Sequence, residues 1–372
     1  MKVLHIAPSF PPAIGGVETF VADPASWQAA SGVAVAVVAG TTDVGERDEH
    51  HNGLPVHRLP FVDTLGRRDL GSLVDLRHRL TAIADGYAPD LIHLHPVAAE
   101  MIFMRDLART TRVPVVATLH VDIAWQPAIY RTNLLSLLAR AHAVAAVSRP
   151  LLGDAIEAFP TQAQKLHLVE NGLARQGRSE IEAEPAHFLY LGRLVTEKGV
   201  DIALRALARL SDRAPAVRLT IAGDGPDRAM LEDLAETLGL GGRVSFLGQI
   251  DRGHVPELMA RHMALLVPSR WREPFGLVVL EAAMAGRPAI VSATGALPDL
   301  VVHGVTGLHV EPENPEVLAN AMAHLAQAQE QAHRMGLAAS ARAVSDWSIA
   351  RCGEAYQALY AQAARDVAHP RG

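Results

Sequence analysis

Residues 264–281 read ALLVPSRWREPFGLVVLE, and this stretch contains the local pattern from which the fold can be inferred. Its first four residues form a short apolar run, which is typical of a strand buried on both faces. A polar loop follows, and from Gly276 the apolar residues continue in a segment that predicts a helix. The stretch is therefore a strand, a loop and a helix in succession, the repeating element of parallel α/β sheets.

The same alternation of short apolar runs and longer helical segments extends along the chain and predicts an α/β fold with parallel sheets. In the first half we expect strands at residues 2–7, 33–38, 56–59, 91–94, 113–118, 143–147 and 166–169. In the second half we expect strands at residues 187–191, 218–222, 244–247, 264–267 and 289–291. Helices are expected to start near Glu197, Asp227, Val255 and Leu277, and the Ala-rich stretch 319–343 should be helical.

The chain has 372 residues, which is more than one hydrophobic core normally serves, so we expect two domains. Between Asn171 and Pro185 large apolar residues are scarce, which indicates a connection. We therefore predict domains at residues 1–172 and 186–345. Two open parallel sheets present the carboxyl ends of their strands to a cleft, where ligands normally bind.

Charge and composition argue against several classes of function. A net charge of -6 gives no electrostatic basis for a nucleic-acid partner. No apolar run approaches the about 18 residues of a transmembrane helix, and residues 1–7 are too short for a signal peptide. The single cysteine, Cys352, cannot form an internal disulfide, is expected to pack on a helix, and suits a cytoplasmic location.

Glu273 and Glu281 are candidates for binding a polar ligand. Glu273 stands in the loop after the strand, and Glu281 lies about a turn and a half into the helix. Both carboxylates can accept hydrogen bonds from sugar hydroxyls, and the helix N-terminus after Gly276 favours negative charge. From the residues alone, the alternative is a capping carboxylate and a glutamate on a solvated helix face.

Arg193 and Lys198 lie in a turn, residues 192–199, that follows the first strand of the second half. An arginine and a lysine in such a turn can neutralise a diphosphate without a metal ion. The chain contains no Asp-x-Asp pair, the usual carboxylate clamp for a nucleotide-bound divalent cation, so we expect no metal and no other cofactor. The alternative is a pair of surface charges.

Three glycines mark turns that a ligand could approach. Gly223 lies in AGDGP, residues 222–226, which lacks the third glycine of the dinucleotide fingerprint and so argues against a dehydrogenase. Gly15 and Gly16 join the first strand to the first helix and expose backbone N–H groups. The alternatives are a plain helix-start turn and a flexible loop.

Three histidines lie at the ends of strands in the first half, at the edge where cleft residues belong. His120 comes directly after Leu119, and strand alternation places His93 and His95 on one side of their strand, so one of them could line an acceptor pocket. A zinc site formed by the three is an alternative that we do not favour, and a structural role is the usual one for a lone histidine.

These motifs resemble those of the retaining glycosyltransferases of family 4 (GT4), which have the GT-B fold of two Rossmann-like domains facing a cleft. The resemblance rests on EPFGLVVLE at residues 273–281, on residues 282–288 and on residues 295–301, and it covers nearly the full length. The acceptor side departs from the common pattern, for example at residues 31–35, and is poorly defined. The family's final helix, here about residues 347–364, crosses back to the first domain.

The resemblance implies roles for the donor-side residues. In the family the first glutamate contacts the donor sugar and the second holds the ribose, which implies these roles for Glu273 and Glu281. The backbone amides of Phe275, Gly276 and Leu277 would meet the sugar and phosphates.

The resemblance also implies roles for the other candidates. It makes the turn of Arg193 and Lys198 a diphosphate-binding turn, and it makes Gly223 a wall of the nucleotide pocket. It implies that the Gly15–Gly16 loop faces the donor phosphate and acceptor, and that His120 meets the donor sugar.

The expected function is transfer of a sugar from a nucleoside diphosphate sugar to a hydroxyl of a small-molecule, oligosaccharide or lipid acceptor, with retention of configuration. A nucleotide-sugar epimerase of the same fold and a non-catalytic sugar-nucleotide-binding subunit are the alternatives. A pyridoxal-dependent phosphorylase is disfavoured, because the chain has only three lysines, Lys2, Lys165 and Lys198. The donor, the acceptor and the oligomeric state stay open.

Overall fold

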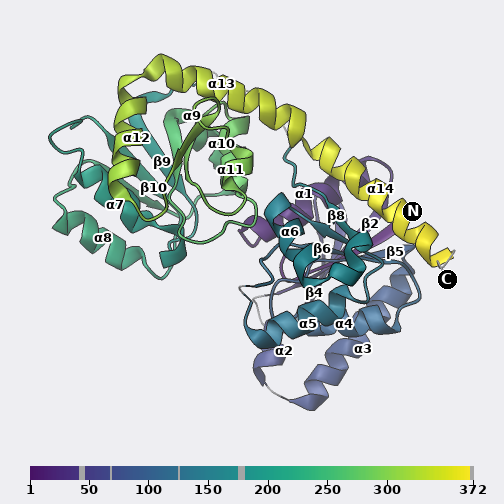
Figure 1. Cartoon of the computed structure of the whole chain (residues 1–372). Coiled ribbons are helices and arrows are strands. Elements are labelled where there is room, and N and C mark those ends of the chain that lie inside the picture. Colours follow the sequence, from purple (N-terminus) through teal and green to yellow (C-terminus); the bar gives the residue numbers. More distant parts are fainter. Residues whose placement is uncertain (42–46, 68, 125, 175–180, 369–372) are drawn as a thin grey trace. The chain divides into compact units, whose positions relative to one another are not determined.

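The structure is a computed structural model that describes residues 1–41, 47–67, 69–124, 126–174 and 181–368. The chain divides into two compact units (Figure 1), one formed by Met1–Ala174 with Ile349–Gly372 and one by Arg175–Ser348. Six residues of the connection that the sequence indicates, 175–180, lie outside the described residues. No helix in the described part of the chain is both long and apolar enough to cross a membrane.

The first unit is built on an eight-stranded sheet with the order β3-β4-β2-β1-β5-β6-β7-β8. Its strands are β1 (Lys2–Ala7), β2 (Ala34–Gly40), β3 (Arg47–His51), β4 (Leu54–Leu59), β5 (Leu91–Leu94), β6 (Val115–Leu119), β7 (Ala143–Ala146) and β8 (Leu166–Leu168). Its helices are α1 (Gly16–Ala30), α2 (Phe61–Arg67), α3 (Leu70–Tyr87), α4 (Met101–Thr110), α5 (Ala128–Leu138), α6 (Arg149–Ala158), the short 3-10 helix η1 (Pro160–Lys165) and the terminal α14 (Ile349–Ala368).

The central strands of this sheet are buried on both faces, as their continuous apolar runs predict. β1 lies parallel between β2 and β5, so that His5 is directly opposite His93 across the β1–β5 pair. Because neighbouring residues of a strand point to opposite faces, a histidine in each strand at one level of the sheet brings two imidazoles together. The register of the sheet therefore builds a histidine cluster inside the unit.

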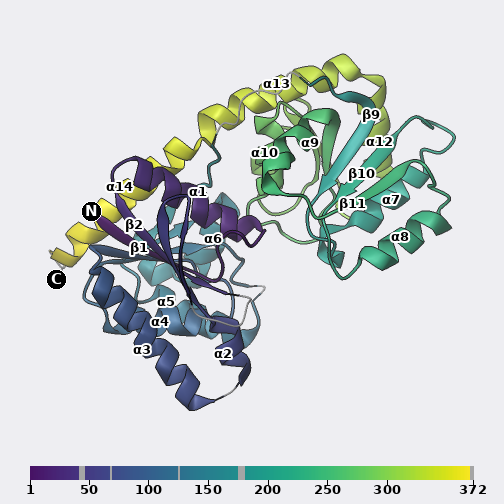
Figure 2. The ribbon, with the colours of Figure 1, turned by 180° about the vertical axis from the view of Figure 1, so that it is seen from behind.

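Helix α14 packs on the first unit, although it comes last in the sequence. Figures 1 and 2 both show it beside α1, and Cys352, Tyr356 and Tyr360 are buried in one cluster with Val3 and Leu91. Cys352 is 3% exposed, and burial raises the pKa of its thiol to about 12. The cysteine therefore packs on a helix, as the sequence predicts, and is not a reactive thiolate.

The second unit is built on a six-stranded sheet with the order β11-β10-β9-β12-β13-β14. Its strands are β9 (Glu184–Leu191), β10 (Arg218–Ala222), β11 (Val244–Gly248), β12 (His262–Val267), β13 (Ala289–Ser292) and β14 (Gly307–Val310). Its helices are η2 (Thr196–Lys198), α7 (Val200–Ala208), α8 (Arg228–Thr237), η3 (Arg252–His254), α9 (Val255–Arg261), α10 (Leu277–Met284), α11 (Leu297–Leu300), α12 (Pro315–Gln327) and α13 (Gln329–Asp346).

The strands expected from the sequence are all present, with ends shifted by a few residues, but two strands were not expected. β3, with the sequence RDEHH, has no apolar residue, and it is the antiparallel edge strand beside β4. β14 is a four-residue strand at the opposite edge of the second sheet. Edge strands pair on one side only, so their sequences need not show the apolar run on which the prediction rests.

Two helix predictions need correction. The expected single helix over residues 319–343 is two helices, α12 and α13, which meet at Ala328 with φ -114° and ψ 58°. The helix expected near Glu197 begins at Val200, after the 3-10 turn Thr196–Lys198. Helix propensity is high around Ala328, so it does not locate that interruption. In the other region Gly199, with φ 68°, separates the 3-10 turn from α7.

Candidate functional site

The loop between β12 and α10 holds Glu273 in one defined position. The residue is 6% exposed, and its Oε1 accepts hydrogen bonds from Lys198 Nζ at 2.7 Å and from Ser269 Oγ at 2.6 Å. A buried carboxylate needs such partners, because burying an unpaired charge is costly. The site therefore contains a negative charge with its compensating cation already in place.

The backbone of Glu273 is held by the turn that follows β13. The N–H of Ala296 donates to the carbonyl of Glu273 at 2.9 Å. Gly295 has φ 57°, and a Cβ on it would lie 2.4 Å from the backbone nitrogen of Glu273. Only glycine fits this close approach, so the residues of 295–301 that carry the family resemblance serve to position Glu273.

Arg270 connects the Glu273 loop to the turn that contains Lys198. Its backbone N–H donates to the carbonyl of Glu197 at 2.9 Å, and its guanidinium donates to the carbonyl of Thr196 at 2.8 Å. The same guanidinium binds both oxygens of Asp201, at 2.7 and 2.8 Å. Burial acts to raise the pKa of Asp201, but the hydrogen bonds and charge of Arg270 outweigh it and hold that pKa below its usual value.

Helix α10 begins directly after this loop. Gly276 is its N-cap with φ 110°, Phe275 is 2% exposed beneath it, and Leu277 is its first residue. The first N–H groups of a helix have no partner within the helix, so this end favours an anion or a hydroxyl oxygen. Glu281 lies on the same helix and is half-buried.

The turns after β9 and β10 pack backbone to backbone. The N–H of Gly192 donates to the carbonyl oxygen of Ala222 at 3.0 Å. Gly223 has φ 133°, and a Cβ on it would lie 1.9 Å from the carbonyl oxygen of Gly192. The requirement for glycine at 223 is thus a packing requirement as well as a conformational one. Gly223 lies at the carboxyl edge of the second sheet, next to the turn of Arg193.

Arg193 differs from Lys198 in its surroundings. Its side chain is exposed, and within the described residues its guanidinium has no hydrogen-bond or ion-pair partner, whereas its carbonyl accepts from Tyr190 Oη at 2.8 Å. Burial, and then the charge of Glu273, raise the pKa of Tyr190 above its usual value, so the phenol stays protonated. The backbone of Arg193 is therefore held by Tyr190, while its exposed guanidinium can bind an anionic ligand.

In the first unit, Gly15 and Gly16 stand where the sequence places them, between β1 and α1. Gly15 is the N-cap of α1 in an extended conformation, and Gly16 is the first helical residue. The Ser9 hydroxyl donates to the Glu18 carboxylate across this loop. The loop thus presents a helix N-terminus at the carboxyl end of β1.

His120 follows β6 and is joined to His95. His120 Nε2 lies 3.0 Å from His95 Nδ1, and its ring stacks on that of Phe20 with the centroids 6.0 Å apart. Burial lowers the pKa of His120 to about 3, so the imidazole is neutral at neutral pH. Its other nitrogen, Nδ1, is buried and has no hydrogen-bond partner among the described residues.

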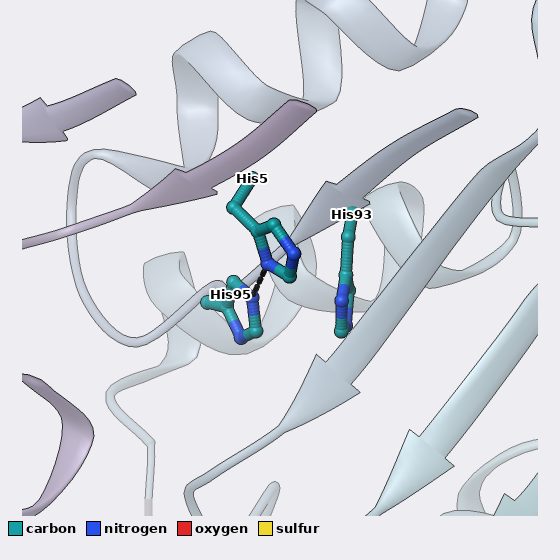
Figure 3. A group of neighbouring side chains, drawn as sticks. All are labelled: His5, His93 and His95. Carbon is teal, nitrogen blue, oxygen red and sulfur yellow. Dashed lines mark hydrogen bonds between the residues drawn. The ribbon is translucent and has the colours of Figure 1, made fainter. Parts of the chain in front are cut away.

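His93 and His95 both lie in the interior of the first unit, together with His5 (Figure 3). One nitrogen of each lies within 4.8 Å of the others, a spacing that could accommodate a metal ion. However, His93 Nδ1 lies 2.7 Å from Tyr360 Oη, and His93 Nε2 lies 2.7 Å from Thr118 Oγ1. Both ring nitrogens of His5 also have hydrogen-bond partners. A metal would have to displace hydrogen bonds that the unit has already formed.

Sequence reasoning did not identify Ser269, Arg270 and His5 as residues of these sites. Ser269 and Arg270 stand in the same loop as Glu273. The polar and charged residues of that loop, Ser269, Arg270 and Arg272, were the sequence signal that partners of Glu273 lie there. His5 interrupts the apolar run at residues 3–7, and this position inside a predicted buried strand was the sequence signal, because histidine is seldom fully buried. The structure shows it 1% exposed.

Solved structures with the same architecture define the class of fold. The sucrose-phosphate synthase of Thermosynechococcus elongatus superposes with a TM-score of 0.83 at 24% identity, covering 97% of this chain and 99% of that one. The Anabaena protein HepE, crystallised with UDP and glucose, superposes with a TM-score of 0.82 at 24% identity and the same coverage. The two α/β units therefore constitute a GT-B fold.

Sequence comparisons identify the family. A model described as Glycosyltransferase Family 4 matches residues 14–176, and one described as Glycosyl transferases group 1 matches residues 175–342. A glycogen synthase of Mycobacterium tuberculosis is 30% identical over 409 residues, covering 100% of this chain and 97% of that protein. The chain belongs to the group 1, family 4 glycosyltransferases.

Proposed function

We propose that this glycosyltransferase moves a sugar from a nucleoside diphosphate sugar to a hydroxyl of a small-molecule, oligosaccharide or lipid acceptor, with retention of configuration and without a metal ion. The observation that carries the proposal is the Lys198–Glu273 pair, a buried carboxylate and a lysine held together where the loops after β9 and β12 meet. The UDP and glucose in the HepE structure support a donor of this class.

The donor is held by residues of the second unit. Glu273 accepts hydrogen bonds from the sugar hydroxyls, and Glu281 binds the ribose. The amides of Phe275, Gly276 and Leu277, at the start of α10, face the sugar and the phosphates. These assignments follow the family resemblance and are supported by the burial of Glu273 and by the helix N-terminus after Gly276.

The cations Arg193 and Lys198 stabilise the leaving group. As the bond between the anomeric carbon and the phosphate oxygen breaks, negative charge grows on the diphosphate, and two nearby cations lower the energy of that state. Lys198 is fixed by Glu273, while the side chain of Arg193 has no partner within the described residues to give up. Together they take the place that a metal ion has in other phosphate sites.

Retention follows when attack and departure occur on one face of the sugar. The acceptor oxygen forms its bond to the anomeric carbon on the side that the diphosphate leaves, and the acceptor proton passes to the departing phosphate oxygen. Neutral His120 contributes a hydrogen-bonding nitrogen for the sugar from the first unit. No carboxylate is assigned the role of a covalent nucleophile.

The alternatives predict different products. A nucleotide-sugar epimerase would convert the donor without an acceptor, and a non-catalytic subunit would bind the donor without turnover. Membership of the glycosyltransferase family favours neither. The complete set of Arg193, Lys198, Glu273 and Glu281 also speaks against a chain that has lost catalysis.

The test is a donor screen followed by a product analysis. Purified protein is heated with UDP-, GDP-, ADP- and dTDP-sugars, because a donor that binds the folded state raises the melting temperature. The stabilising donor is then incubated with candidate acceptors in EDTA, and the anomeric configuration of the product is read by NMR. Transfer with retention in EDTA supports the proposal; inversion, a need for added metal, or epimerisation without acceptor overturns it.

A further inference from the structure

Four buried side chains of the first unit form one line of hydrogen bonds that ends at His120. Gln28 Oε1 lies 3.0 Å from His5 Nε2, His5 Nδ1 lies 3.1 Å from His95 Nε2, and His95 Nδ1 lies 3.0 Å from His120 Nε2. Figure 3 shows the step between His5 and His95. The line runs from α1 through the sheet to its carboxyl edge, and each member is at most 6% exposed.

The far end of the line is anchored on α14. Gln28 Nε2 donates to Tyr360 Oη at 3.1 Å, and Tyr360 Oη lies 2.7 Å from His93 Nδ1. His93 Nε2 in turn lies 2.7 Å from Thr118 Oγ1. The Tyr360 hydroxyl accepts a hydrogen bond from the Gln28 amide, and its single O–H then donates a hydrogen bond to His93 Nδ1.

The Gln28 amide, in the orientation that it has in the structure, implies one direction for the protons along the line. Its Oε1 can only accept, so His5 carries its proton on Nε2 and leaves Nδ1 as an acceptor. His95 must then donate from Nε2 and accept at Nδ1, and His120 must donate from Nε2. Burial lowers the pKa of all four histidines of the cluster, so each ring holds a single proton at neutral pH.

The line leaves one atom unsatisfied, His120 Nδ1. This nitrogen is buried and has no hydrogen-bond partner within the described residues. When His120 carries its proton on Nε2, Nδ1 presents a lone pair. A buried acceptor without a partner costs free energy that a ligand hydroxyl can recover. A second direction of the line exists, with the Gln28 amide turned over, and it would instead put a proton on this nitrogen.

We propose that Tyr360, Gln28, His5 and His95 are positioning residues, which hold His120 in the Nε2–H tautomer so that its Nδ1 accepts a hydrogen bond from a hydroxyl of the bound substrate. This inference rests on the proposed function, which places a sugar at His120. It assigns a task in the reaction to a terminal helix that is far from His120 in sequence. The Gln28 amide links the two, since its orientation connects Tyr360 on α14 with the tautomer of His120.

The experiment compares two phenol removals on α14. In Tyr360→Phe the Gln28 amide loses its hydrogen-bond partner on α14 and is no longer held at that end, so we expect His120 to become a mixture of tautomers. Tyr356→Phe is the matched control, because the Tyr356 hydroxyl lies one turn away and is bonded to Thr118 at 3.1 Å, outside the line to His120. Long-range proton–nitrogen NMR of histidine-labelled protein reads the tautomer without any substrate.

The expected result is an Nε2–H His120 in the wild type and in Tyr356→Phe, and a mixed signal in Tyr360→Phe. Adding Gln28→Glu to Tyr360→Phe is expected to restore the Nε2–H form, because an ionised carboxylate only accepts. We expect kcat/KM to fall on the order of 2- to 10-fold in Tyr360→Phe, the effect of one hydrogen bond, and to stay unchanged in Tyr356→Phe.

Three results would overturn the inference. These are an Nδ1–H His120 in the wild type, the same His120 signal in Tyr360→Phe as in Tyr356→Phe, and stoichiometric zinc bound through His5, His93 and His95. Because the tautomer is read without substrate, this outcome is separate from that of the donor screen. A chain that lacks transferase activity yet shows the expected tautomers would contradict the proposed function alone.

Discussion

Lys198 Nζ lies 2.7 Å from Glu273 Oε1, an ion pair between residues 75 positions apart in the sequence. The pair forms because β9 and β12 are neighbours in the sheet, so the loops that follow them leave at the same edge. It couples the residue proposed to hold the donor sugar to the residue proposed to neutralise the leaving diphosphate. A substitution of either residue should therefore change the position and the electrostatic environment of the other.

Glu273→Gln keeps the size and an acceptor for Ser269 but removes the charge that pairs with Lys198. We expect the donor still to raise the melting temperature and kcat to fall on the order of 100-fold, as when one preorganised group of a site is lost. Glu197→Gln, an exposed neighbour of Lys198, is the control and should turn over normally. Full activity of Glu273→Gln would remove this residue from the mechanism.

Arg193→Ala tests a cation with an exposed side chain. Because the guanidinium has no partner within the described residues, its loss should leave the free energy of unfolding unchanged while kcat/KM falls roughly 10- to 100-fold, since charge-assisted contacts to phosphate are lost. Arg218→Ala is the matched control, because Arg218 is the first residue of β10 and lies at the end of that strand away from the turns of Arg193 and Gly223. Equal kinetics for the two variants would contradict a phosphate role for Arg193.

Arg270→Lys tests whether the two loops are held by the forked guanidinium. A lysine keeps the charge but cannot bind both Asp201 oxygens and the Thr196 carbonyl together. We expect a loss of roughly 1 to 3 kcal/mol in the free energy of unfolding, the range for hydrogen bonds to charged groups, discounted because the site is partly exposed. Urea unfolding measures it, and an unchanged midpoint would mean that the fork does not stabilise the loops.

The buried histidines should make stability depend on pH. Burial lowers the pKa of His5 to about 4 and of His120 to about 3, and lowers those of His93 and His95 as well. An unfolded histidine titrates near 6.5, so below that pH the unfolded chain binds protons that the folded chain does not. Stability is therefore complete above about pH 6.5 and falls toward pH 4, by up to about 1.4 kcal/mol per pH unit for each histidine.

Urea midpoints at pH 8, 6.5, 5.5 and 5 would measure this slope. His5→Gln should flatten it, whereas His254→Gln should not, because His254 is exposed on the second unit. A midpoint that stays constant between pH 8 and pH 5 would show that the cluster does not remain neutral in the folded protein.

The α/β class and most strands could be predicted from the sequence, because strands buried on both faces must be apolar along their whole length. This signal fails at sheet edges, where pairing by the backbone needs no apolar side chain. The polar strand β3, Arg47–His51, is the example, since its pairing with β4 is visible only once β4 is in place.

Local motifs and their family resemblance suffice to name the candidate residues, from Glu273 and Glu281 to Arg193, Lys198 and His120, because each motif is formed by residues adjacent in the chain. The contacts among these residues come from the folded chain, in which Lys198 meets Glu273, Arg270 joins their loops, and His5 lies beside His95. Such contacts depend on strand order and register, which bring together residues that are 75 or 90 positions apart. A hydrogen bond requires atoms about 3 Å apart, and the spacing of two residues in the sequence does not say whether the fold brings them that close.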